Sequence, residues 1–276
     1  MHQPSIVQRK RTTRRRAQRV ARRVLPFLAS LFLATPIAGP VNKSMASEAS
    51  QGHRALRPGA AGPALAPTPD RAGQLRTTYQ VLGAEAQGLT FATFERAMTG
   101  YRNLQAAGKL ADDKQRLTVV DFDLPSTAKR LWVLDLATNQ VLFHTLVAHG
   151  HNSGENEATR FSNTDASNMS SLGFYVTEGE YAGKHGRSLR LVGQDEGWNT
   201  NAATRSIVMH GADYVSEDFI RQHGRLGRSL GCPALPMAEK DAIIAAVAGG
   251  TCLFVNRSDA GFASRYWSRE KAVTAS

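Results

Sequence analysis

Cysteine is scarce in this sequence: the 276 residues include two, Cys232 and Cys252. The pair permits at most one disulfide bond. Cys252 lies in a short apolar run at 251–255 that is typical of a buried strand, so we expect it to be a small core residue. A disulfide would consume the Cys232 thiol, so a bridged pair and a reactive Cys232 exclude each other.

Acidic residues are absent from the first 46 positions, which carry ten lysines and arginines. These charges make up most of the formal net charge of +11 and leave +1 for the rest of the chain. The basicity therefore belongs to a leader segment and gives no reason to expect a nucleic acid partner for the folded part.

The apolar run in this leader, at 24–34, is too short to span a bilayer comfortably. A cationic region, a short apolar run and small residues ending at Ala46 are typical of an export signal, which we place at 1–46. No cysteine is present in the leader, which argues against a lipoprotein anchor. Arg22-Arg23 leaves twin-arginine export open beside the general secretory route. An uncleaved leader is the one expected membrane contact, and a basic tail with a membrane-anchoring helix is the alternative.

A composition that is 42% hydrophobic and 21% charged is typical of a globular protein. Ala, Pro and Gly dominate the segment after the leader, which cannot bury enough apolar surface to offset chain entropy. Apolar residues then recur every three or four positions from Thr90 to Gly108, which predicts an amphipathic helix. The predicted segments are the leader at 1–46, a disordered tether at 47–72, a helical extension at 73–116, a main domain at 117–257 and a C-terminal tail at 258–276.

Strand-like runs separated by turn residues fill most of the main domain. The expected strands lie at 117–122, 130–136, 140–148, 173–177, 188–192, 206–210 and 251–256. Thr138-Asn139 joins the second and third of these runs as a hairpin. Short helices are expected at 216–223 and 236–248. This pattern predicts a mainly β fold, a mixed β-sandwich or barrel-like sheet with a few short helices.

Residues 227–231 fit the G-x-S-x-G pattern of serine hydrolases, with Ser229 as the nucleophile. That motif requires a buried strand before it, and an acid and then a histidine after it in the chain. Residues 221–225 are polar, and no histidine follows His223. A serine triad is therefore disfavoured.

A cysteine nucleophile fits the same stretch better. Cys232 follows a glycine turn, and His210 ends an apolar run, where the edge of a sheet holds an imidazole rigidly. An adjacent imidazole lowers the pKa of a thiol from about 8.5 toward neutrality. The backbone amides of Leu230 and Gly231 are expected to form an oxyanion hole. Spacing alone leaves two unrelated buried residues as the alternative.

From residue 117 to 256, the sequence resembles the catalytic domain of murein L,D-transpeptidases, the YkuD-like fold, and specifically its divergent second branch. The resemblance rests on His210-Gly211 after a strand and on Gly-Arg-Ser-Leu-Gly-Cys-Pro-Ala at 227–234. The segment at 170–175 is similar to the substrate-side loop of the family. The resemblance implies a YkuD-like mixed β-sandwich catalytic domain.

Three positions depart from the family pattern. Ordinary members have a histidine where Leu230 stands, and an arginine or asparagine soon after the cysteine, where Pro233-Ala234 stand. We expect Arg228 to supply the missing contact with the substrate carboxylate or the thiolate. The balance of transpeptidase against hydrolase activity stays open.

By resemblance, His210 removes the Cys232 proton and is oriented by the backbone carbonyl of Gly211. The thiolate attacks the carbonyl of the third residue of a peptidoglycan tetrapeptide stem and expels the terminal D-amino acid, leaving a thioester. An amine then forms a 3-3 cross-link, or water gives carboxypeptidase activity. The resemblance implies stem peptides as partners, a periplasmic or cell-wall location, and neither cofactor nor metal.

Polar loop residues are the candidates for lining the substrate pocket, although each also fits a turn or core role. They are Ser162, Asn163, Ser171, Tyr175, Tyr214, Ser229 and His149. The histidines at 144, 149 and 151 are potential ligands of a metal ion, but no carboxylate or cysteine follows at a recognised metal spacing. A catalytically silent cell-wall-binding module and a metal-dependent peptidoglycan hydrolase are the alternative functions.

Overall fold

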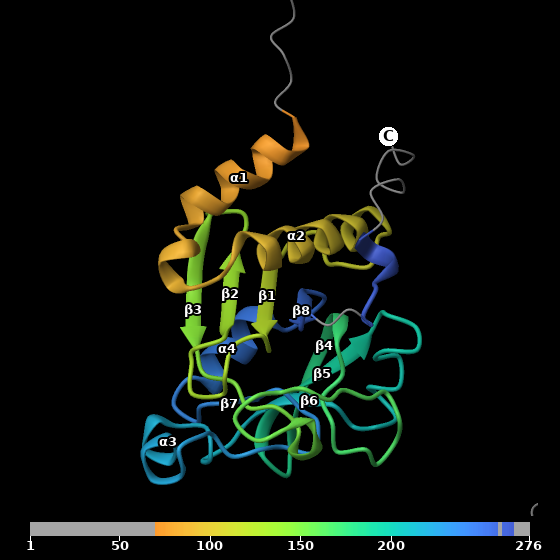
Figure 1. The fold of residues 1–276 in the computed structure, drawn as a ribbon. Coiled ribbons are helices and arrows are strands. Elements are labelled where there is room, and N and C mark those ends of the chain that lie inside the picture. The colour runs from red at the N-terminus through yellow and green to blue at the C-terminus, as the bar shows by residue number, and fades with distance from the viewer. Residues whose placement is uncertain (1–69, 259–260, 268–276) are drawn as a thin grey trace, which may run out of the picture. The chain divides into compact units, whose positions relative to one another are not determined.

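The structure of the chain is a computed structural model that describes residues 70–258 and 261–267 (Figure 1). The predicted leader lies outside these residues, as do nearly all of the predicted tether and much of the predicted tail. No helix in the described part of the chain combines the length and apolar character that crossing a bilayer requires.

Two helices precede the sheet, α1 at Arg71–Leu82 and α2 at Phe91–Ala106, with the 3-10 turn η1 at Glu85–Gln87 between them. The Thr90 side chain begins α2 by accepting a hydrogen bond from the Thr93 amide. Phe94, Met98, Tyr101 and Leu104 are among the residues that α2 buries. The amphipathic helix predicted from Thr90 is therefore confirmed.

Eight strands form one mixed sheet in the order β3-β2-β1-β8-β4-β5-β6-β7. Their bounds are β1 Arg116–Asp121, β2 Leu131–Asp135, β3 Gln140–Thr145, β4 Gly173–Gly183, β5 Gly186–Gly193, β6 Val208–Gly211, β7 Ala234–Leu235 and β8 Cys252–Asn256. β1 with β8 and β6 with β7 pair in parallel, and the other neighbours are antiparallel. The predicted mainly β fold and the β2–β3 hairpin are confirmed.

The two edges of this sheet meet, which gives it a barrel-like curl. Ala148, just beyond β3, forms an antiparallel bridge with Ala234 of β7, and its amide donates to the Ala234 carbonyl at 2.9 Å. A second bridge pairs Gly150 with Ser229. These bridges hold the segment after β3 against the segment that carries Cys232.

Short helices flank the later strands. They are η2 at His151–Ser153, α3 at Glu217–His223, α4 at Lys240–Val247 and η3 at Arg265–Trp267. α4 packs on β1, β5 and β6 (Figure 1). It is shorter than the predicted helix at 236–248, because the chain turns at 237–239 before the helix begins.

A buried polar network fastens α2 to the sheet. The Thr93 hydroxyl donates to one Asp121 carboxylate oxygen at 3.0 Å, and the Asn256 amide donates to the other at 2.8 Å. The Asn103 side chain of α2 also donates to the Tyr266 carbonyl of η3 at 2.6 Å. The helical extension is thus bonded to β1, to β8 and to the last described turn.

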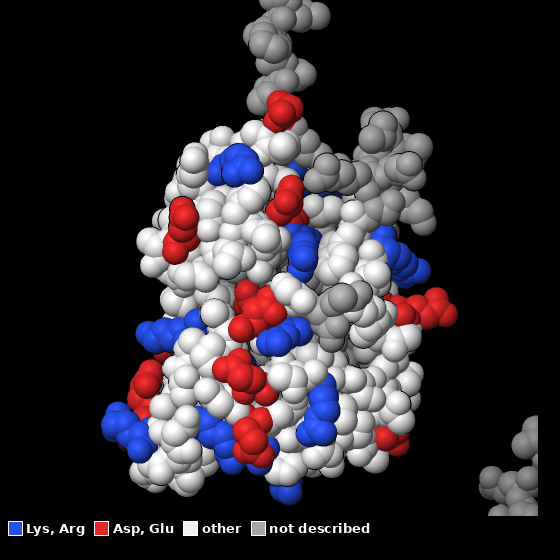
Figure 2. Space-filling view, viewed as in Figure 1, with Lys and Arg blue, Asp and Glu red and all other residues white. Residues whose placement is uncertain are grey.

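On the face of the molecule shown in Figure 2, basic and acidic side chains of the described residues are interspersed. This pattern agrees with the small net charge of the chain outside its leader. It gives this face no extended field of one sign with which to attract a polyanion.

Candidate active site

Cys232 lies on the turn that leads into β7, and its thiol is half-buried. The sulfur accepts a hydrogen bond from the Val208 amide at 3.4 Å and donates to the Ser206 carbonyl at 3.6 Å. Cys252 is fully buried in β8, and both cysteines are free thiols. The disulfide alternative is therefore wrong for this structure. The contacts with Ser206 and Val208 place the Cys232 sulfur against the start of β6.

Ser229 stabilises this turn through two hydrogen bonds of its hydroxyl. Its hydroxyl accepts from the Gly231 amide at 3.0 Å and donates to the Cys232 carbonyl at 2.7 Å. Gly231 has a φ of +123°, and a Cβ there would lie 2.7 Å from the Met169 carbonyl oxygen. The position therefore requires glycine. Ser229 was expected to contact substrate, but its buried hydroxyl is engaged within the turn.

His210 comes from β6 and is paired in parallel register with Ala234. Its Nδ1 lies 2.9 Å from the Gly211 carbonyl oxygen. Since a carbonyl oxygen accepts, Nδ1 carries the proton and Nε2 is left as the basic nitrogen. Burial lowers the pKa of His210 below its usual value; the Gly211 carbonyl opposes this shift, and nearby His185 adds to it.

His210 lies on β6, and Cys232 lies on the turn that precedes β7, the parallel neighbour of β6. Cys232 is two residues before the partner of His210, and its sulfur contacts Val208, two residues before His210 itself. Val208 and His210 are two residues apart on β6, so they lie about 7 Å apart and point to the same face of that strand. Among the described residues, the thiol has hydrogen bonds with Val208 and Ser206 and none with His210.

The thiol and the imidazole are both neutral near pH 7. Burial raises the pKa of Cys232, and the Val208 amide and the Arg205 charge only partly oppose that shift. The expectation that the imidazole would lower the pKa of the thiol is therefore not met in this structure, because burial outweighs the groups that favour the thiolate. His210 remains an unprotonated base because its own pKa is lowered.

The amides proposed for an oxyanion hole differ in their surroundings. The Gly231 amide is already bonded to Ser229, so it has to give up that bond to donate elsewhere. The Leu230 amide has no hydrogen-bond partner among the residues that the structure describes. The Leu230 side chain is 71% exposed and projects from the same turn.

Two residues expected to line the pocket lie beneath it instead. Ser171 is 3% exposed and donates to the Ser162 carbonyl at 2.8 Å, and Tyr175 is 2% exposed and donates to the Ser171 carbonyl at 3.0 Å. Their hydroxyls brace the segment 162–171, so burial removes them from direct contact with a substrate. Tyr214 is half-buried. Its pKa is raised, mainly by burial and secondarily by the negative charge of a Cys232 thiolate.

His149 is also not a pocket residue, contrary to the prediction. It is fully buried, with Nδ1 2.8 Å from an Arg130 Nη2 and Nε2 3.3 Å from the Gly154 carbonyl oxygen. Burial, reinforced by Arg130, lowers its pKa to about 4. Both ring nitrogens are engaged, so His149 is unsuited to bind a metal ion, and no cluster of three potential ligands occurs within 70–258 and 261–267.

Arg228 braces a loop rather than reaching the thiol. Its Nη1 donates to Glu155 Oε1 at 2.7 Å, to the Gly154 carbonyl at 3.1 Å and to the His151 carbonyl at 3.3 Å. These contacts engage Nη1 of the guanidinium that was expected to bind a substrate carboxylate and direct it toward the 151–155 segment. The acid that pairs with Arg228 lies 73 positions away in the sequence, so no local pattern predicted this contact.

Sequence reasoning missed two residues of the site. His185, at the tip of the β4–β5 hairpin, stacks on His210 with ring centroids 4.4 Å apart. Arg205 lies before β6, beside the nucleophile turn. The missed signal for His185 was the glycine on either side of the tip, Gly183 and Gly186, which marks the hairpin turn. No local pattern distinguishes Arg205 from the other arginines of the sequence.

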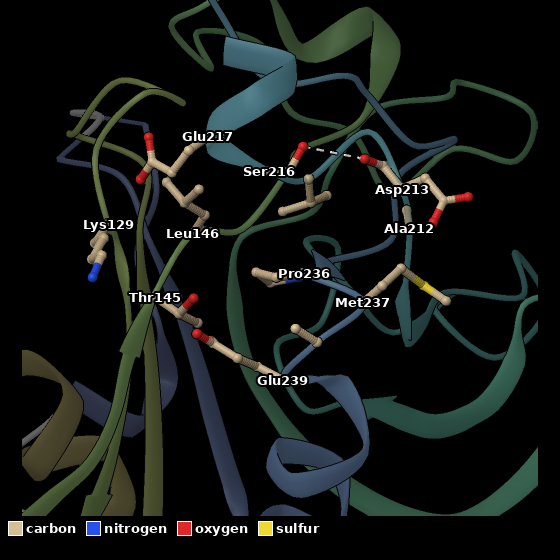
Figure 3. Close-up of a pocket in the computed structure, with 12 residues that line it drawn as sticks. Lys129, Thr145, Leu146, Ala212, Asp213, Ser216, Glu217, Pro236, Met237 and Glu239 are labelled. Atoms are coloured by element: carbon tan, nitrogen blue, oxygen red, sulfur yellow. Dashed lines mark hydrogen bonds between the residues drawn. The ribbon is translucent and has the colours of Figure 1, made fainter. Parts of the chain in front are cut away.

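A cavity of about 320 Å³ adjoins the thiol, because Ser206 and Val208, which both contact the sulfur, line it. Its other lining residues are Glu178, Tyr181, Arg190, Leu191, Ala203 and Ile207. A larger cavity of about 480 Å³, shown in Figure 3, is lined at Ala212 and Pro236, beyond the ends of β6 and β7. The smaller cavity is the candidate substrate cleft, since it lies at the end of β6 where the sulfur is.

Comparison with known proteins gives one family. The model of the L,D-transpeptidase catalytic domain matches residues 85–256. Similar solved structures include an L,D-transpeptidase from Mycobacterium smegmatis, with 13% identity, a TM-score of 0.34 and coverage of 52% of this chain and 59% of that one. L,D-transpeptidase 1 from Mycobacterium tuberculosis has 12% identity, a TM-score of 0.30 and coverage of 52% and 62%.

A third structure, an L,D-transpeptidase (Yku) from Stackebrandtia nassauensis, has 14% identity, a TM-score of 0.32 and coverage of 68% of this chain and 93% of that one. The chain spans about three fifths of the length of the two mycobacterial proteins. Among curated proteins, no relative matches.

Proposed function

Since the matching model spans more than half of the chain, the chain belongs to the L,D-transpeptidase catalytic domain family, and we propose that it is an exported cysteine acyltransferase acting on peptidoglycan stem peptides. The observation that carries the proposal is the placement of Cys232 beside β6: its sulfur contacts Val208, two residues before His210, and the Gly211 carbonyl holds His210 Nδ1. That bond leaves Nε2 free to act as a base.

The first half-reaction forms a thioester. His210 Nε2 takes the thiol proton as the Cys232 sulfur bonds to the carbonyl carbon of the third stem residue, and the carbonyl oxygen becomes an oxyanion. Collapse of this intermediate breaks the bond to the terminal D-amino acid, whose nitrogen receives the proton from His210. The sulfur must first leave the Ser206 carbonyl, to which its proton is directed in the structure.

The second half-reaction releases the enzyme. An amine of a neighbouring stem gives a proton to His210 and attacks the thioester carbon, and the Cys232 thiolate leaves and is reprotonated. Water in place of the amine gives carboxypeptidase activity. The Leu230 amide, and Gly231 once it parts from Ser229, are the proposed oxyanion donors; each such donor typically contributes about 3 kcal/mol to transition-state stabilisation.

Two parts of the proposal rest on the sequence. Export to the periplasm or cell wall rests on the leader at 1–46, and the choice of stem peptides as substrate rests on the family. The proposed substrate contact of Tyr214 rests on its partial exposure, and the proposed oxyanion role of Leu230 rests on its backbone amide, which has no partner among the described residues.

Release of the terminal D-amino acid from purified tetrapeptide muropeptides tests the proposal. Cys232→Ala should abolish release, whereas Cys252→Ala, which removes the other and fully buried thiol, should retain it in the folded protein. Unchanged release by Cys232→Ala would refute a cysteine mechanism.

One observation favours a second candidate, a catalytically silent cell-wall-binding module. The thiol has a raised pKa and bonds to Ser206 rather than to His210. This candidate predicts that the wild-type protein binds isolated peptidoglycan sacculi but releases no D-amino acid, and that Cys232→Ala binds them equally well.

A further inference from the structure

Arg205 joins the two segments that surround the candidate nucleophile. Its guanidinium donates to four oxygens of the segment 162–171 and approaches the turn at Gly231. The four acceptors are the Ser162 carbonyl at 2.7 Å, the Ser171 hydroxyl at 2.5 Å, the Ser167 hydroxyl at 3.0 Å and the Met169 carbonyl at 2.6 Å.

None of these four acceptors is a carboxylate, so the charge of Arg205 is not cancelled by a contacting acid. The charged and titratable groups that act on it at longer range are Asp165, Tyr175 and Cys232 itself. Burial lowers the pKa of Arg205, but an arginine starts so high that it stays protonated across the physiological range. A fixed positive charge therefore lies in a partly buried place.

The charge lies directly beside the nucleophile turn. A Cβ built on Gly231 would be 3.3 Å from Arg205 Nη2 and 2.7 Å from the Met169 carbonyl oxygen, which itself accepts from Nη2. A second contact joins the same two segments: the Ser170 hydroxyl donates to the Gly231 carbonyl at 3.1 Å. Segment 162–171 is therefore held against the residue that precedes Cys232.

We propose that Arg205 is a positioning residue for Cys232: it fixes segment 162–171 against the nucleophile turn and holds a positive charge beside the sulfur while negative charge develops there. The proposal deepens the proposed function and rests on it for its link to turnover. The effect on the thiol itself is independent of any substrate.

The need for such a charge follows from the burial of the sulfur. A half-buried thiolate far from any cation is costly, and His210 has no hydrogen bond to this thiol. The groups that favour the thiolate are the Val208 amide, the Arg205 charge and the amide of Cys232 itself, and Arg205 is the cation among them. Arg228, which the sequence suggested for this task, is bonded to Glu155 instead.

The same charge serves both half-reactions. It stabilises the sulfur as it loses its proton during attack, and it stabilises the thiolate as a leaving group when the thioester is resolved. Lysine does not reproduce this arrangement, because its single ammonium group cannot bridge four acceptors in one plane as a guanidinium does.

Alkylation of Cys232 by iodoacetamide as a function of pH tests the proposal without a substrate. Arg205→Gln should move the alkylation profile to higher pH and slow alkylation at pH 8 by about tenfold, because a tenfold fall in thiolate corresponds to one pKa unit. Arg205→Lys should fall between the wild type and Arg205→Gln. The matched control is Arg221→Gln, which removes the same charge from an exposed site on α3 and should leave the profile unchanged.

A wild-type profile in folded Arg205→Gln overturns the proposal. Should Arg205→Gln fail to fold, Arg205→Lys decides the matter, since a profile superimposable on the wild type would overturn it as well. Failure of the proposed function is a separate outcome: a protein that releases no D-amino acid but whose thiol still depends on Arg205 keeps this inference and loses the proposed function.

Discussion

The His185 ring stacks on the His210 ring, with centroids 4.4 Å apart and planes inclined by 23°. His185 stands at the tip of the β4–β5 hairpin, and His210 lies on β6, which pairs with β5 through Ser188. The hairpin thus covers the candidate base, helps to bury it and places a second imidazole against it.

Replacing His185 with alanine should raise the pKa of His210, because the change exposes the ring and removes its titratable neighbour. A base must be unprotonated to act, so the acid limb of the pH profile of kcat/KM should move to higher pH. His223→Ala is the matched control, since His223 stacks on Phe219 at the end of α3. An acid limb that stays in place, or moves to lower pH, would contradict this account of the hairpin.

Replacing Gly231 with alanine should destabilise the protein by about 2 kcal/mol or more, because its φ of +123° strains an L residue and its Cβ meets the Met169 carbonyl. Gly179→Ala is the control, since nothing lies within 4 Å of a Cβ at that position of β4. Urea denaturation measures both free energies of unfolding. Equal stability of the two variants would show that the turn does not require glycine.

His149 should make the free energy of unfolding depend on pH. Its pKa is about 4 in the folded chain and about 6.5 when unfolded, so protons favour the unfolded chain between these values. The contribution of His149 to the free energy of unfolding is fully present above pH 6.5, and it should fall by roughly 3 kcal/mol as the pH drops to 4.

The comparison that isolates this effect is His149→Asn, which retains an acceptor for Arg130 but does not titrate. Urea denaturation at several pH values should give a shallower acid slope for the variant than for the wild type. Parallel curves for the two proteins would rule out His149 as the source.

Arg228→Gln should lower stability by on the order of 1 to 2 kcal/mol and leave the KM for tetrapeptide within about twofold, because the guanidinium bonds the 151–155 segment. Glu155→Gln should have a smaller effect in the same direction, since that carboxylate is largely exposed. A large rise in KM for Arg228→Gln alone would restore the substrate role that the sequence suggested.

The sequence predicted the features that depend on local patterns. Apolar runs located β6 and β8, the Thr90 cap located the start of α2, and the lack of a later histidine removed Ser229 as a nucleophile. The sequence missed what depends on pairing at a distance. The β4–β5 hairpin extends past its apolar runs into exposed residues around Gly179, so its tip, with His185, was not recognised.

Burial also decided several roles that residue type left open. His149 and Arg130 lie 19 positions apart and satisfy each other inside the fold. The Ser171 hydroxyl accepts a hydrogen bond from Arg205, which lies 34 positions away. A polar residue in a loop is equally compatible with a pocket or a brace until its partner is known, and here the partners are distant in sequence.

The mass of the Cys232 peptide after brief incubation with tetrapeptide muropeptide and acid quenching tests the cysteine mechanism most directly. In the wild type, this peptide should carry a thioester and be heavier by the stem without its terminal D-amino acid, and no such adduct should form on Cys232→Ala. An unmodified Cys232 peptide in wild-type protein that nevertheless releases the D-amino acid would contradict it.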